Sequence, residues 1–200
     1  MKFEWFFKIC GFLTPITAYT LIFISIMNAP WFSWRINALS DLGVVFPSSI
    51  YFNFGLIFSG FLELIYSIGL IFQFRGLLHR LSIFTLIFDS ISLMGIGFFP
   101  ETAGKIHFYF SVAFFAFYPL SLLIFFLGSL VDKYHFKLGL LGLILAFTSI
   151  GIWIFPWKTF GVKGVAIPEF LSSLCGSIWI FISSIIIFKR NINPGKLKII

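Results

Sequence analysis

The sequence predicts an all-helical, polytopic membrane protein built as a bundle of six transmembrane helices. Hydrophobic residues make up 60% of the 200-residue chain and charged residues only 10%, and the mean hydropathy is +1.05. A soluble globular domain carries about a quarter charged residues and under half apolar ones. The composition therefore excludes a cytosolic enzyme, a disordered chain and a disulfide-stapled secreted domain. A membrane β-barrel is also disfavoured, because its strands alternate polar and apolar residues over about 10 positions.

Six apolar stretches are long enough to cross a bilayer, which takes about 20 mostly apolar residues in a helix. They fall within one membrane domain covering residues 1–200, at about 9–28, 51–73, 81–99, 107–131, 138–157 and 167–188. Short polar segments separate them, except for the long first connection between residues 29 and 50. Any functional site must therefore be built from the helices and their loops.

The basic residues predict an orientation with both termini in the cytoplasm. In that orientation the cytoplasmic side carries ten of the 14 Lys and Arg residues: Lys2, Lys8, Arg75, Arg80, Lys133, Lys137, Lys189, Arg190, Lys196 and Lys198. The other four lie outside: Arg35, Lys105, Lys158 and Lys163. An excess of Lys and Arg marks cytoplasmic loops, so the net charge of +7 reports topology and no nucleic-acid partner is expected. The predicted location is the plasma membrane.

Two carboxylates lie inside predicted spans, Glu63 in the second and Asp89 in the third. A charge at that depth costs at least about 2.5–3.5 kcal/mol. The two helices should be antiparallel neighbours, and a rise of about 1.5 Å per residue puts both carboxyl groups within about one turn in depth. We expect an intramembrane acidic pair that shares a proton. It forms either a hydrogen-bond cluster with Ser59, Ser67 and Ser92, or a proton or cation relay; alternatively one acid faces a partner subunit or a lipid headgroup.

A second concentration of polar residues is predicted at the extracytoplasmic face. It comprises loop residues and residues near helix ends: Arg35, Asn37, Ser40, Asp41, Asn53, Glu101, His107 and Glu169. Helix capping explains several of them singly, but their convergence on one face predicts a site. Asp41 and His107 are the candidate catalytic residues, as a general acid and base. The candidate substrate-binding residues are Arg35, Asn37, Ser40, Asn53, Glu101 and Glu169.

Several chemistries are disfavoured at this site. A zinc ion needs three or four His, Cys or carboxylate ligands, and the topology separates His79 and His135 from His107, which excludes a three-histidine site. One histidine with two or three carboxylates is the remaining way to bind a metal, but no metal or other cofactor is expected. A triad of Ser40, His107 and Asp41 is disfavoured, because adjacent Ser and Asp residues could hardly both reach the histidine in the required roles. The sequence leaves open whether the site catalyses a reaction.

Two family resemblances rest on these loop residues. The run Asn37-Ala38-Leu39-Ser40-Asp41-Leu42-Gly43, the later Gly95-Ile96-Gly97-Phe98-Phe99-Pro100 and His107 resemble the uncharacterised prokaryotic membrane family "domain of unknown function 998". That resemblance covers nearly the whole chain and implies an architecture and a site but no reaction. Ser40-Asp41 with Gly43 is more distantly similar to the Frag1/DRAM/Sfk1 family, whose members are linked to lipid handling. This second resemblance implies that Asp41 and His107 contact a lipid headgroup or act in catalysis.

Three functions follow from these observations. The first is a lipid-binding or lipid-modifying protein with its polar site at the extracytoplasmic face and membrane lipids as its partners. The alternative is a structural or accessory subunit of a larger membrane complex, which would bind partner membrane subunits or further copies of itself. The third is a small proton-coupled transporter that uses Glu63 and Asp89.

Overall fold

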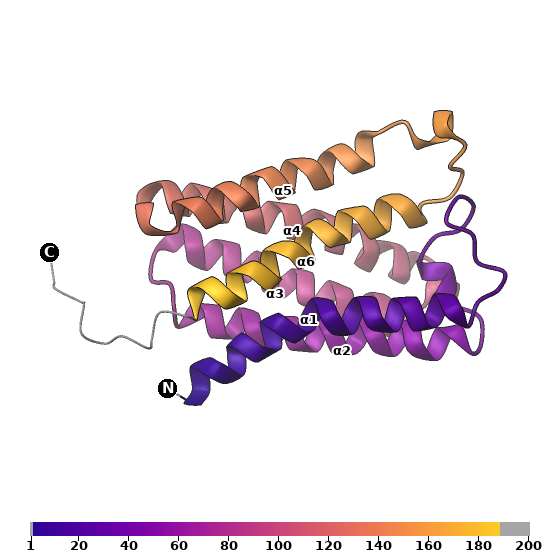
Figure 1. The fold of residues 1–200 in the computed structure, drawn as a ribbon, viewed down its shortest axis with the longest axis horizontal. Coiled ribbons are helices and arrows are strands. Elements are labelled where there is room, and N and C mark those ends of the chain that lie inside the picture. Colours follow the sequence, from indigo (N-terminus) through magenta and orange to yellow (C-terminus); the bar gives the residue numbers. More distant parts are fainter. Residues whose placement is uncertain (1, 189–200) are drawn as a thin grey trace, which may run out of the picture.

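The six apolar stretches form six long α-helices in the computed structural model, which describes residues 2–188 (Figure 1). The helices are α1 Lys2–Met27, α2 Ser48–Ile71, α3 Leu77–Phe98, α4 Lys105–Val131, α5 Phe136–Ile154 and α6 Ala166–Ile187. All six are long and apolar enough to cross a membrane, and no strand occurs between residues 2 and 188. The predicted fold class is therefore confirmed, and the chain is a multi-pass membrane protein.

Several helices begin or end at other residues than the predicted membrane spans. Helix α1 begins at Lys2 rather than near residue 9, and α3 begins at Leu77 rather than near residue 81. Backbone hydrogen bonds continue beyond the apolar run because a helix does not have to end where its sequence becomes polar. Helix α5 ends earlier than predicted, at Ile154. The next residue, Phe155, is extended (φ −62°, ψ 137°) because it precedes a proline, which disfavours helical backbone.

The six helices form a closed ring. Each helix packs against the next in sequence, and α6 also packs against α1. The predicted antiparallel pairing of the second and third helices is confirmed in this arrangement. Figure 1 shows that α1 begins and α6 ends at the same end of the bundle, as an even number of crossings requires.

The two ends of the bundle differ in their connections. The loop end consists of residues 28–47, 99–104 and 155–165, and the turn end consists of the short connections at residues 72–76 and 132–135. The location of the loop end on the extracytoplasmic side stays a prediction. It rests partly on residues outside the described part of the chain: Lys189, Arg190, Lys196 and Lys198.

Small residues allow the helices to approach closely. A Cβ atom at Gly60 of α2 would lie 2.7 Å from Met94 Cγ and 2.8 Å from the Ser90 carbonyl oxygen, both in α3. Glycine at this position therefore brings the two backbones together, as small residues commonly do between membrane helices. This close contact places Glu63, three residues after Gly60, against α3.

Candidate functional site

The first loop is folded around the carboxylate of Asp41. One oxygen, Oδ2, accepts hydrogen bonds from Asn37 Nδ2 at 2.7 Å and from the Ala38 backbone amide at 3.0 Å. The Asn37 side chain in turn accepts a hydrogen bond from the Ser33 amide at 2.9 Å. These bonds stabilise the loop ahead of a short 3-10 helix, η1 (Ser40–Gly43). Asp41 thus fixes the loop at the mouth of the bundle.

Hydrogen bonds also hold the same loop against the start of α6. Glu169 Oε2 accepts a hydrogen bond from the Leu39 amide at 2.7 Å. The Ala166 amide donates to the Asn37 carbonyl oxygen at 2.9 Å. The loop and the first turn of α6 are therefore joined, with Glu169 bonded to Leu39, the residue that precedes η1.

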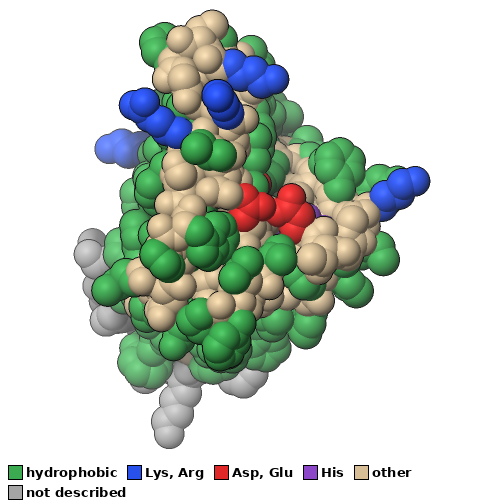
Figure 2. All heavy atoms as spheres, turned by 90° about the vertical axis from the view of Figure 1, so that its right-hand side faces the viewer, with side chains coloured by type: hydrophobic (Ala, Val, Ile, Leu, Met, Phe, Trp, Pro, Cys, Tyr) green, Lys and Arg blue, Asp and Glu red, His purple; other side chains and the backbone are tan. Residues whose placement is uncertain are grey.

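A third segment, η2 (Glu101–Ala103), completes the cluster. Ser40 Oγ donates a hydrogen bond to Glu101 Oε2 at 3.2 Å. Partial burial raises the pKa of the Glu101 carboxyl above its ordinary value of 4.5, and the Asp41 carboxylate raises it further, whereas Ser40 and His107 act in the opposite direction. Figure 2 shows this end with acidic side chains near its centre and Lys and Arg side chains toward its edges.

His107 is buried at the start of α4, beside this acidic group. Its Nδ1 lies 2.7 Å from the Phe99 carbonyl oxygen. A carbonyl oxygen only accepts, so Nδ1 carries the proton and a neutral ring presents Nε2 as an acceptor. His107 and Asp41 both influence the pKa of Glu101, and Asp41 Oδ2 also accepts hydrogen bonds from Asn37 and Ala38. His107 thus lies near Glu101, while its Nδ1 hydrogen bond goes to the Phe99 carbonyl oxygen.

The two other predicted residues lie outside this group. Asn53 Nδ2 donates to the Gly43 carbonyl oxygen at 2.9 Å, which holds η1 against α2. Arg35 lines a separate cleft with Trp157 and Phe160 at the same end. The structure therefore brings together the remaining six residues as the loop-end cluster: Asn37, Ser40, Asp41, Glu101, His107 and Glu169.

An internal cavity of about 80 Å³ leads from this cluster into the bundle. Ser40 and Glu169 line one end of it, and Glu63 and Asp89 line the deep end. A water molecule needs about 10–15 Å³ by this kind of measure, so the cavity has room for several waters or a small polar group. The predicted loop-end site and the predicted acidic pair are thus parts of one continuous space.

Glu63 and Asp89 meet at the deep end of the cavity, with only 2% and 1% of their surfaces exposed. The two carboxyl groups lie close enough to interact with each other, and a hydrogen bond between them requires at least one proton because two ionised carboxylates have no donor. One oxygen of each, Glu63 Oε1 and Asp89 Oδ1, has no hydrogen-bond partner. No other described residue donates a hydrogen bond to these two oxygens, and both side chains line the cavity.

Further polar side chains line the cavity that were not among the predicted site residues. Tyr19 OH lies 3.1 Å from Ser173 Oγ and accepts a hydrogen bond from Ser177 Oγ at 3.3 Å. The hydroxyl of Tyr118 is buried and has no partner. Ser173 and Ser177 are four residues apart, a spacing that puts them on one helix face and that could have indicated a polar lining from the sequence.

One family model matches a stretch of the chain that includes the whole loop-end cluster. The family model described as "Protein of unknown function (DUF998)" matches residues 12–186. This range includes part or all of each of the six helices and every residue of the loop-end cluster. Neither a curated protein nor a solved structure matches the chain.

Proposed function

We propose that this chain, which belongs to the DUF998 family of proteins of unknown function, binds a membrane lipid. The headgroup would contact the loop-end cluster, and an acyl or other apolar chain would lie in a groove on the side of the bundle. One observation carries the proposal. The lateral groove and the internal cavity have three lining residues in common, Ser111, Phe115 and Glu169.

The groove lies between α4 and α5 and reaches the start of α6. Its walls are largely apolar and include Val112 and Ala116 on α4 and Ile150 and Trp153 on α5, all exposed on the bundle surface. In a bilayer this surface faces lipid, so a lipid chain can occupy the groove without crossing water. Glu169 at its upper edge places a carboxylate where the headgroup of such a lipid would lie.

The headgroup must provide the affinity, because lipid tails are as apolar as the groove and gain little from leaving the bilayer. Asp41, Glu101 and Glu169 offer carboxyl oxygens, and His107 offers Nε2 as an acceptor when its ring is neutral. Within residues 2–188, no Lys or Arg side chain forms an ion pair with these acids. A cluster of acceptors suits a headgroup that donates hydrogen bonds, through hydroxyl or ammonium groups, better than it suits a bare phosphate.

A lipid-modifying role would use Glu101 and His107. Asp41 Oδ2 is already engaged by two donors of its own loop, whereas Glu101 has a raised pKa and lies within the influence of His107. A carboxyl group whose pKa is raised toward neutrality can act as a general acid or base. Glu101 would then exchange protons with the headgroup while His107 Nε2 accepts from it.

Native mass spectrometry in mild detergent tests the binding proposal. We expect one tightly bound lipid on the wild type, at least tenfold less of it on Ala116→Trp, which fills the groove, and a comparable loss on Glu169→Gln. Leu127→Trp is the matched control, because Leu127 is exposed on α4 outside the groove. Equal lipid retention by all four proteins would contradict the proposal, and a co-purifying partner chain without bound lipid would favour an accessory subunit.

Proton-coupled transport is a second candidate, favoured by the unpartnered oxygens of Glu63 and Asp89 in the cavity. On α2 the lining of the cavity ends at Glu63, and beyond it Tyr66 and Leu70 are completely buried. A transporter would need this packed half of the bundle to open. Proton flux into proteoliposomes that is lost in Glu63→Gln but kept in Glu4→Gln would support it, and flux no greater than that of empty liposomes would exclude it.

A further inference from the structure

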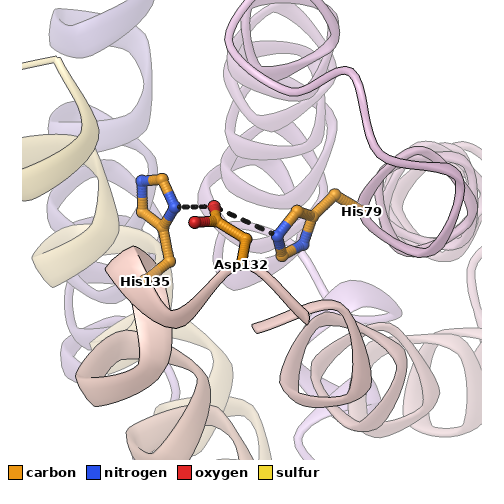
Figure 3. A group of neighbouring side chains, drawn as sticks. All are labelled: His79, Asp132 and His135. Atoms are coloured by element: carbon orange, nitrogen blue, oxygen red, sulfur yellow. Dashed lines mark hydrogen bonds and ion pairs between the residues drawn. The ribbon is translucent and has the colours of Figure 1, made fainter. Parts of the chain in front are cut away.

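Three potential metal ligands meet at the turn end, far from the loop-end cluster. Figure 3 shows the carboxylate of Asp132 between the rings of His79 and His135. Asp132 Oδ2 lies 2.6 Å from His135 Nδ1 and 3.7 Å from His79 Nε2. One ligand atom from each of the three residues lies within 4.8 Å of the other two.

His79 is the most constrained of the three. Only 3% of its surface is exposed, and neither of its ring nitrogens has a hydrogen-bond partner. The ring packs between Phe74 and Phe125, with centroid distances of 4.6 and 4.7 Å. A Cβ atom at Gly128 would lie 2.6 Å from its Nδ1, so glycine is what lets α4 accommodate the ring.

Packing of this kind fixes the position of the imidazole ring but gives its nitrogens no hydrogen-bond partner. Buried polar atoms in proteins are nearly always hydrogen-bonded, and an exception calls for an explanation such as a missing ion. The separation of 3.7 Å between His79 Nε2 and Asp132 Oδ2 is too long for a hydrogen bond. Nε2 of His79 is thus a buried nitrogen that faces the Asp132 carboxylate but is too far from it for a hydrogen bond.

We propose that His79, Asp132 and His135 bind a divalent first-row transition-metal ion, for which Zn²⁺ is the best-suited candidate. Two imidazole nitrogens and one carboxylate oxygen form a ligand set that zinc accepts, with bonds of about 2.0–2.2 Å. Tetrahedral geometry at such bond lengths separates ligand atoms by roughly 3.4 Å. The observed distances of 2.6 and 3.7 Å lie on either side of that value, so small side-chain movements suffice.

The surroundings leave the ion a free coordination position. The same residues line an open cleft, together with Arg75 and Val131, so solvent reaches the cluster. The Asp132 side chain is 41% exposed and lies in a connection between helices, where it can adjust. Its other oxygen, Oδ1, accepts a hydrogen bond from the Tyr134 amide at 3.2 Å, which orients the carboxylate as outer-shell bonds do in metal sites.

An ion pair without metal explains only half of the cluster. It accounts for the short contact between His135 and Asp132 and for the approach of His79 Nε2 to Asp132 at 3.7 Å, but it leaves both nitrogens of His79 without a hydrogen bond. A bound ion would satisfy all three residues at once. The ligand set lies at the end of the bundle opposite the lipid groove, so this inference does not depend on the proposed function.

Metal titration of untagged, chelator-treated protein in detergent tests the proposal. We expect one Zn²⁺ per chain by elemental analysis, and with Co²⁺ a visible absorption band typical of four- or five-fold coordination. His79→Gln, Asp132→Ala and His135→Ala should each weaken binding at least tenfold. His107→Ala is the matched control, because it removes the one histidine outside the cluster.

Size-exclusion profiles and thermal midpoints identify variants that fail to fold, and His135→Ala is the decisive one because its side chain is 16% exposed, whereas His79 is almost completely buried. Stoichiometric binding by the wild type and His107→Ala, but not by folded His135→Ala, supports the site. A folded wild type that binds no metal overturns it and leaves a histidine–aspartate ion pair. Equal binding by the wild type and all three cluster variants also overturns it.

Discussion

The carboxylate of Glu169 accepts a hydrogen bond from the backbone amide of Leu39, with 2.7 Å between Oε2 and N. The two residues are 130 positions apart in sequence, and their contact fastens the long first loop to the start of α6. Glu169 also lines both the internal cavity and the lateral groove. One side chain therefore links the fold of the loop with the proposed lipid site.

Replacing Glu169 should separate its structural role from its binding role. In Glu169→Ala the Leu39 amide loses its acceptor in a buried position, and an unsatisfied buried group costs about 1–3 kcal/mol. Glu169→Gln keeps an acceptor oxygen and should lose less. Unfolding of the two variants by a denaturing detergent measures the difference, and equal stabilities would contradict a role for this hydrogen bond.

Gly60 should be intolerant of substitution because its backbone contacts α3 directly. A methyl group there meets Ser90 and Met94 at under 3.0 Å, and overpacking of this kind typically costs about 1–3 kcal/mol. Gly151 is the control, because nothing lies within 4 Å of its Cβ position, and alanine there should be neutral or stabilise α5 by up to about 1 kcal/mol. Thermal midpoints of Gly60→Ala and Gly151→Ala that shift equally would refute the close contact.

Binding of an amine headgroup should depend on pH through Glu101. Its pKa is raised above 4.5, and only the ionised form attracts an ammonium group. The affinity for an ethanolamine-headgroup lipid should therefore fall as the pH falls through that pKa. Glu101→Gln, which cannot ionise, should lack this step in a binding profile measured from about pH 4 to pH 8. A profile for Glu101→Gln identical to that of the wild type would assign the pH dependence to another group.

The predicted orientation can be tested with single cysteines at opposite ends. Lys163 and Lys133 are both exposed, one at the loop end and the other at the turn end. The native Cys10 and Cys175 are buried and should react slowly. A membrane-impermeant maleimide added to intact cells should label Lys163→Cys and should label Lys133→Cys only after the cells are opened. The reverse pattern would place the loop end in the cytoplasm.

The six helices were predictable because each depends on a local property, an apolar run of sufficient length. The placement of Glu63 against α3 could be predicted for a similar reason, since a short turn and a constant rise per residue set the depth of Glu63 and Asp89. The helix ends differ from the ends of the predicted spans. The start of α1 at Lys2 depends on backbone hydrogen bonds that continue past the apolar run.

Side-chain partners were not predictable from the sequence. The pairing of Asp41 with His107 stays a prediction, but nothing in the sequence indicated that Asp41 Oδ2 accepts hydrogen bonds from Asn37 and Ala38 within its own loop. The grouping of His79 with Asp132 and His135 depends on the rotation of α3 about its axis and on the space left by Gly128. The cavity could not be predicted from the sequence either, because it depends on how five helices and η1 pack together.

The central claim is that a lipid occupies the groove between α4 and α5, and photo-crosslinking tests it most directly. A lipid with a photoreactive group in its apolar chain would be incorporated with the protein into vesicles, and the crosslinked peptides would be mapped by mass spectrometry. We predict that crosslinks concentrate on residues 108–116 and 149–154, which line the groove, and decrease in Ala116→Trp. Crosslinks spread equally over other exposed positions such as Phe54 and Phe58 on α2 would contradict a specific lipid site.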